Sequence, residues 1–217
     1  MTEQQVILFQ TLKSFDKIGI LKHVILIGSW AEYLYTYLYE GFVPNMRTTD
    51  VDFLYPNIRK PNEKVPLNEI LKSDGFISDT DGFGVTRYHH GHDLELEFLA
   101  SERGSGQTKQ YRIESLGIMV EGLRLSLLIE ESIEIEAEGL VVSVPGPWAY
   151  VLHKLSINSI RGNKAAKDME AIRILLDYFD GEEYFAGNFK RCYAGLTKKQ
   201  RDAVDETCKA NFVKLPV

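Results

Sequence analysis

The stretch LIGSWAEYLYTYLYEGFVPNMRTTDVDFLY, residues 26 to 55, decides the fold of this chain. It joins a Gly-Ser turn, at the end of one apolar run, to Asp50 and Asp52 in a second apolar run. Side chains of a strand alternate between its faces, so both aspartates project to one side and Val51 and Phe53 project to the other. An isolated charge is costly to bury, so this pair either faces water or holds a positive group.

The segments around this stretch predict an α+β fold. Residues 3–17 and 30–38 have apolar residues at helical spacing, whereas residues 23–28 and 48–55 read as strands. Further strand candidates, separated by glycine-containing turns, are residues 84–90, 93–100, 112–122 and 133–145. From Pro147 onward the apolar spacing is helical. We therefore expect a mixed β-sheet flanked by helices over residues 1–144 and a helical C-terminal region over residues 145–217.

Composition and charge narrow the class of protein. The 217 residues are 44% apolar and 26% charged, which is an ordinary globular mixture. A net charge of -6 argues against broad attraction to phosphate backbones, although a local basic groove would escape that argument. The two cysteines, Cys192 and Cys208, form no disulfide framework, and no apolar run is long enough to span a bilayer. We expect a cytoplasmic protein without a membrane segment.

Two carboxylates on one strand face can hold hard divalent cations such as Mg²⁺, which prefer oxygen ligands. For an isolated D-x-D the ordinary explanation is a solvated face of an antiparallel sheet. Two features favour a site here. The turn at Gly28 and Ser29 lies between a strand and a helix, where backbone amides can bind phosphate. In addition, the run DLELEFL, residues 93–99, repeats the order acid, apolar, acid, Phe, Leu of DVDFL, residues 50–54.

The segment IGS followed by TDVDFL resembles the hG[GS]…hDhDh signature of the nucleotidyltransferase superfamily, whose fold is shared with DNA polymerase beta. The longer lead-in VPNMRTT resembles an uncharacterised bacterial group of nucleotidyltransferase-like proteins. The stretch VPGPWAYVLHKLSINSIRGNKAAKDMEAIRILL is similar to the same group through its HKL helix, downstream Arg and KD helix. The resemblance extends from about residue 24 to about residue 178.

This resemblance implies a metal-dependent transfer of a nucleoside monophosphate from a nucleoside triphosphate to an acceptor. Asp50 and Asp52 would bind Mg²⁺ or Mn²⁺. The third carboxylate would be Glu97, with Glu95 in reserve, and it would bind one metal and activate the attacking hydroxyl. The family more often has aspartate at this third position. The acceptor could be a small molecule, a protein side chain or an RNA end.

The same resemblance implies a set of nucleotide-binding residues: Gly28, Ser29, Arg47, Lys154, Arg161 and Lys167. Asp168 would orient one of the cations. Arg47 could instead form a salt bridge to Asp50. Lys164 fits a solvated helix face with an ordinary ion pair. Two rival functions stay open: a non-catalytic module of this fold that binds nucleotide or a partner protein, and hydrolysis of a phosphoester by the same carboxylates.

Overall fold

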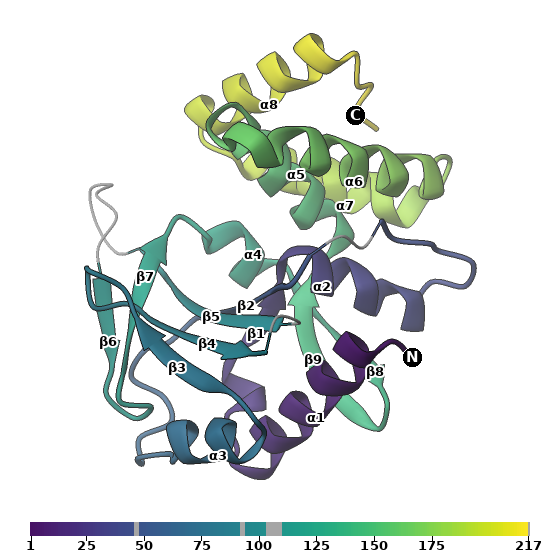
Figure 1. The fold of residues 1–217 in the computed structure, drawn as a ribbon. Coiled ribbons are helices and arrows are strands. Elements are labelled where there is room, and N and C mark those ends of the chain that lie inside the picture. Colours follow the sequence, from purple (N-terminus) through teal and green to yellow (C-terminus); the bar gives the residue numbers. More distant parts are fainter. Residues whose placement is uncertain (46–47, 92–93, 103–109, 217) are drawn as a thin grey trace.

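The structure is a computed structural model that describes residues 1–45, 48–91, 94–102 and 110–216. A mixed β-sheet with helices around it makes up the first part of the chain, and the last helices gather at one end of the molecule (Figure 1). These last helices are α5 (Pro147–Ile157), α6 (Ala165–Tyr178), α7 (Glu183–Gly195) and α8 (Lys198–Asn211). The predicted α+β class is confirmed. Within the described ranges no helix combines the length and the apolarity that crossing a membrane requires.

The main sheet has seven strands in the order β1-β2-β5-β4-β3, with β7 beside β5 and β6 beside β7. Its strands are β1 (Ile25–Ile27), β2 (Asp50–Tyr55), β3 (Ile77–Thr80), β4 (Thr86–His90), β5 (Leu94–Ser101), β6 (Gln110–Ile113) and β7 (Ile118–Leu123). The central pair β2–β5 is parallel, whereas β1–β2 and β4–β5 are antiparallel. The sheet therefore places both predicted acidic strands side by side at its centre.

Two segments expected as single strands are hairpins. Residues 112–122 divide into β6 and β7, with Gly117 at φ +70° in the turn. Residues 133–145 divide into β8 (Ser132–Ala137) and β9 (Leu140–Pro145), which form a separate two-stranded sheet. Glu138 and Gly139 both have positive φ in that turn, as tight hairpin turns require. Apolar spacing alone did not separate the two strands of each hairpin, because apolar and polar residues alternate in the same way in both strands.

The remaining helices are distributed along the chain, and two of them lie between α5 and α6. Thr2 begins α1 (Glu3–Lys17) with a capping box, in which its side chain accepts a hydrogen bond from the backbone of Gln5. The helix that begins at the Gly-Ser turn, α2 (Gly28–Leu34), is shorter than expected and continues as a 3₁₀ turn, η2 (Tyr35–Tyr37). The other short helices are α3 (Leu67–Ser73), α4 (Ser126–Glu130), η1 (Leu21–His23), η3 (Asn158–Ile160) and η4 (Gly162–Lys164).

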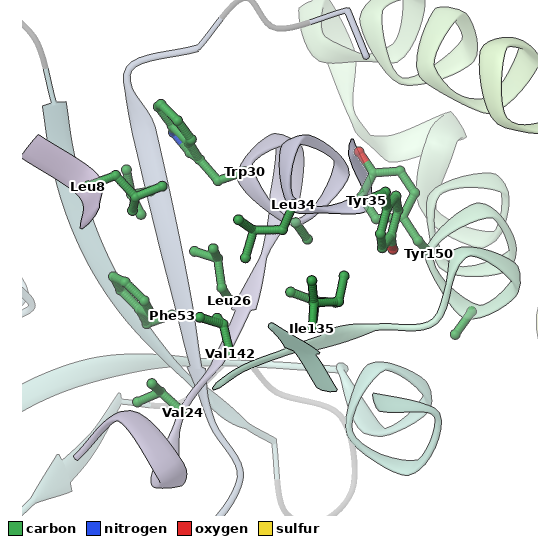
Figure 2. Packing of buried hydrophobic residues seen from close by; sticks show 14 of the residues in the cluster. Leu8, Val24, Leu26, Trp30, Leu34, Tyr35, Phe53, Ile135, Val142 and Tyr150 are labelled. Atoms are coloured by element: carbon green, nitrogen blue, oxygen red, sulfur yellow. The ribbon is translucent and has the colours of Figure 1, made fainter. Parts of the chain in front are cut away.

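One large apolar core joins these elements. Figure 2 shows core side chains from α1, β1, α2 and β2 together with residues of β8, β9 and α5. Phe15 and Phe98 pack against Phe53 with ring centroids 5.1 and 5.6 Å away. The Tyr35 hydroxyl donates a hydrogen bond of 2.7 Å to the carbonyl oxygen of Pro145. This hydrogen bond connects η2, which continues α2, to the end of β9 just before α5.

Candidate functional site

The turn after β1 lies directly against the carboxylate of Asp52. Gly28 has φ +70°, a conformation that glycine adopts readily and other residues rarely do. A Cβ built on Gly28 would lie only 2.7 Å from Asp52 Oδ2. The antiparallel register pairs Ile27 with Asp52, so β1 ends beside the acidic pair of β2. The backbone at Gly28–Ser29 and the Asp52 carboxylate therefore form one wall of a common site.

Four carboxylates lie on one face of the two central strands. The parallel register pairs Asp50 with Glu95 and Asp52 with Glu97, and neighbouring strands are about 4.8 Å apart. Val51, between the two aspartates, and Phe53, after them, point to the opposite face and are completely buried. The predicted alternation is therefore present, and the acidic face is the one that the Gly-Ser turn borders.

The environment of Asp52 disfavours its ionised form. Burial raises the pKa of Asp52 to about 6, and the negative charges of Glu97 and Asp50 act in the same direction. The positive charges of Lys164 and Arg161 oppose this increase without cancelling it. A cation bound beside Asp52 would favour its ionised form, because it would relieve both the repulsion and the loss of hydration.

Lys164 approaches the same carboxylates from the C-terminal part of the chain. Its Nζ atom lies 3.1 Å from Asp50 Oδ2, and the two side chains are 62% and 42% exposed. The sequence favoured a solvated helix face for Lys164. The exposure of the Lys164 side chain agrees with that interpretation. Its ion pair with Asp50, however, places the ammonium group in the candidate site.

A second wall of the site consists of cations arranged around Asp168. The carboxylate of Asp168 accepts hydrogen bonds from Lys154 Nζ and from Arg161 Nε, the latter at 2.8 Å. Asp168 is 2% exposed and Lys154 is 8% exposed. Burial raises the pKa of Asp168, but the two cations outweigh burial and hold this pKa below its usual value. Burial, together with the charge of Lys154, lowers the pKa of Lys167.

Both walls line one pocket of about 550 Å³. Its lining combines the glycine turn and β2 with residues of α5, η4 and α6: Gln4, Gly28, Ser29, Thr48, Thr49, Asp50, Asp52, Lys154, Arg161, Lys164, Lys167 and Asp168. Among the predicted nucleotide-binding residues, Arg47 lies outside the described part of the chain. The other five, which sequence analysis took from two distant segments, meet in this pocket.

Glu97 is engaged elsewhere. Arg87, on β4, donates hydrogen bonds from Nε and Nη2 to Glu97 Oε1 at 3.2 and 3.0 Å. Arg87 also lies 3.5 Å from Glu95. Within the described ranges, no three His, Cys, Asp or Glu side chains are grouped closely enough to hold a metal ion. The structure thus brings Asp50 and Asp52 into the pocket but does not gather Glu97, or its reserve Glu95, with them around a common point.

Glu32 is a residue of this region that the sequence analysis missed. It is 1% exposed, and its carboxylate accepts hydrogen bonds from the Tyr150 hydroxyl at 2.9 Å and from the Asn45 amide at 3.4 Å. Burial raises its pKa, while Tyr150 and the charge of Lys154 oppose that change. The available signal was an acidic residue within the apolar spacing of Trp30 and its neighbours. Arg87 was also missed, because its partner is set by strand pairing.

The sequence was compared with models of known protein families. A family model described as Nucleotidyltransferase matches residues 8–196, so the chain belongs to the nucleotidyltransferase family. The resemblance noted in the sequence is thereby confirmed. A comparison with curated protein sequences gives no match.

Several solved structures are similar to this chain. The structure of ANT(2")-Ia in complex with adenylyl-2"-tobramycin has 15% identity and a TM-score of 0.48, and the match covers 88% of this chain and 99% of that one. An antigenic nucleotidyltransferase-like protein from Paracoccidioides brasiliensis has 17% identity, a TM-score of 0.48, and coverage of 97% and 94%. The lincomycin-bound lincosamide antibiotic adenylyltransferase LnuA has 14% identity, a TM-score of 0.46, and coverage of 81% and 96%.

Proposed function

We propose that this protein is a metal-dependent nucleotidyltransferase that moves a nucleoside monophosphate from a nucleoside triphosphate to an acceptor hydroxyl. The observation that carries this proposal is the single pocket that unites the Gly28–Ser29 turn, Asp50 and Asp52 with several cations from a distant part of the chain. Anionic phosphates need such cations, and a divalent ion needs such carboxylates. The acceptor is a small molecule, a protein side chain or an RNA end.

Asp50 and Asp52 would hold Mg²⁺ or Mn²⁺. Their oxygens are the hard ligands that these ions prefer, and the raised pKa of Asp52 marks a carboxylate that a cation would stabilise in its ionised form. When bound, the ion would neutralise charge on the phosphates. The close approach of Gly28 to Asp52 leaves no room for a side chain there, so backbone lies next to the carboxylate. These features support a site for a metal-bound triphosphate.

The chain's own residues would then position the triphosphate. The cations Lys154, Arg161 and Lys167 would bind its phosphates, and Asp168 would orient the first two. The acceptor oxygen attacks the α-phosphorus, the bond from that phosphorus to the bridging oxygen of the β-phosphate breaks, and pyrophosphate leaves. Glu97, as the third carboxylate, would take the proton of the acceptor hydroxyl. Positioning and charge stabilisation supply most of the catalysis in such a displacement.

A direct test follows nucleotide label into cell extract. Each of the four nucleoside triphosphates, labelled at the α-phosphate, is incubated with Mg²⁺, cell extract and one of three proteins. These are wild type, Asp52→Asn and Asp79→Asn. Asp79→Asn is the control, because it makes the same change at an exposed position of β3. We expect wild type and Asp79→Asn to label an acceptor from at least one nucleotide, and Asp52→Asn to label none while keeping its circular dichroism spectrum. Equal labelling by Asp52→Asn would show that the site is wrong.

A second candidate function is a non-catalytic nucleotide- or protein-binding module. The observation that favours it is the engagement of Glu97 by Arg87, which occupies the third carboxylate. Calorimetric titration with each triphosphate and Mg²⁺, followed by a pyrophosphate-release assay with extract, separates the two functions. Binding without any release of pyrophosphate supports the module, whereas release that depends on Asp52 supports the enzyme.

A further inference from the structure

Arg87 lies among three carboxylates on the acidic face of the sheet. It makes two hydrogen bonds to Glu97 Oε1, its Nη1 atom lies 3.2 Å from Asp81 Oδ2, and its Nε atom lies 3.5 Å from Glu95 Oε1. The Arg87 side chain is 30% exposed and the Glu97 side chain is 22% exposed. Both hydrogen bonds reach the same oxygen of Glu97, and partial burial strengthens such a charge-assisted contact.

The backbone holds this arrangement in place. The antiparallel register of β4 and β5 sets Arg87 directly opposite Glu97. On the other side, the Asp81 carboxylate accepts hydrogen bonds from the backbone amides of Phe83 and Val85 at 2.9 and 3.0 Å. Arg87 is thus fixed between a strand pairing and a turn. A cation approaching Glu97 Oε1 would have to displace a guanidinium that has other carboxylates as partners.

We infer that Arg87 is a built-in counter-ion that keeps Glu97 out of the metal site of the free protein, so that Asp50 and Asp52 alone set its affinity for a divalent cation. The pocket supports this division, because its described lining includes both aspartates and neither Glu97 nor Arg87. The inference rests on the proposed function for the metal site at Asp50 and Asp52. It narrows the role expected of Glu97, because it removes Glu97 as a ligand of the metal in the free protein.

Binding of Mn²⁺ to the full-length, nucleotide-free protein tests this inference without any turnover. Titration followed by the electron paramagnetic resonance signal of free Mn²⁺ gives the dissociation constant of each variant. We expect Asp50→Asn and Asp52→Asn to lose at least about ten-fold in affinity, since both remove a direct ligand. Glu97→Gln should stay within about two-fold of wild type, because it removes no ligand of the ion and leaves Arg87 paired with Asp81 and Glu95.

Changes at Arg87 should have the opposite effect. Arg87→Met frees Glu97 and removes a nearby positive charge, so its Mn²⁺ affinity should rise about three- to ten-fold. That gain should disappear in the double variant Arg87→Met, Glu97→Gln, and Arg87→Lys should stay within about two-fold of wild type because it keeps the charge. Arg112→Met is the matched control, since it removes the same charge from an exposed ion pair on β6. It should leave the affinity unchanged.

The outcomes separate this inference from the proposed function. If Glu97→Gln loses as much affinity as Asp50→Asn, Glu97 is a resting ligand and the inference about Arg87 is wrong, while the proposed function stands. The inference about Arg87 is also wrong if Arg87→Met binds Mn²⁺ no better than wild type. If Arg87→Met does not fold, the Mn²⁺ affinity of Glu97→Gln alone tests the inference. Binding that is unaffected by Asp52→Asn overturns both.

Discussion

Asp168→Asn should lower the free energy of unfolding by about 3 kcal/mol at pH 7, because it leaves the buried ammonium of Lys154 without its anionic partner. Both side chains are almost completely buried, and removing one member of a buried ion pair typically costs about 3 to 5 kcal/mol. The lower end of this range of free energies applies here, because asparagine keeps a hydrogen-bond acceptor. The contact of Asp168 with Arg161 adds little, since the Arg161 side chain is 35% exposed.

For a chain of this size, the loss corresponds to a decrease in Tm of about 6 to 12 °C. The pH dependence has a definite sign. The folded-state pKa of Asp168 is lowered, so its contribution to stability is present above the unfolded pKa and is lost as pH falls through the folded value. The difference between wild type and Asp168→Asn should therefore narrow progressively below about pH 4.

Urea unfolding, followed by both circular dichroism and tryptophan fluorescence, measures this effect. Asp177→Asn, an exposed change on the same helix α6, is the control and should stay within about 0.5 kcal/mol of wild type. In a Lys154→Met background, Asp168→Asn should cost about 1 kcal/mol or less, because no buried ammonium is then left unpaired. An equal cost in both backgrounds, or a loss below about 0.5 kcal/mol in wild type, would refute the reasoning.

Two further changes probe the glycine turn and β2. Burial raises the pKa of Asp52 to about 6, so the ionisation of Asp52 opposes folding as pH rises through that value. The free energy of unfolding of Asp52→Asn should therefore exceed that of wild type by about 1 to 2 kcal/mol at pH 8. Urea unfolding should show this gain shrinking toward pH 4, and no gain at pH 8 would contradict it. Gly28→Ala and Gly19→Ala share a backbone penalty of about 1 kcal/mol at φ +70° and +75°, but a Cβ meets Asp52 only at Gly28. Gly28→Ala should therefore lose clearly more stability in thermal unfolding, and equal losses would argue against the close approach.

Much of the site could be predicted from local patterns in the sequence. The strand period of two placed Asp50 and Asp52 on one face and Phe53 in the core, and the structure agrees. The repeated order of acidic and apolar residues identified the segment that forms β5, and the resemblance to nucleotidyltransferases implied that this segment neighbours β2. Helical spacing after Pro147 located the segment that carries Lys154, although pattern alone could not place that segment opposite the glycine turn.

The parts that the sequence did not reveal depend on pairing between distant segments. Arg87 faces Glu97 because of the register between β4 and β5, and a shift of that register by one residue would turn Arg87 to the other face. Likewise, Lys164 reaches Asp50 only because η4 lies over the pocket. A period or a motif describes one segment at a time, so it predicts which residues share a face but not which partner they meet.

Glu32 connects α2 with α5, the helices that carry Gly28 and Lys154 of the two walls of the pocket. It lies one turn after Gly28 in α2 and accepts a hydrogen bond from Tyr150 of α5. The ammonium of Lys154, one turn further along α5, lies 4.9 Å from the centre of the Tyr150 ring and is hydrogen-bonded to Asp168. Apolar side chains in these positions could give equal or greater stability, but they would allow α2 and α5 to pack in several ways. A buried polar network whose members all have partners selects one arrangement, and a pocket that must align a glycine turn with cations from another helix requires a single arrangement.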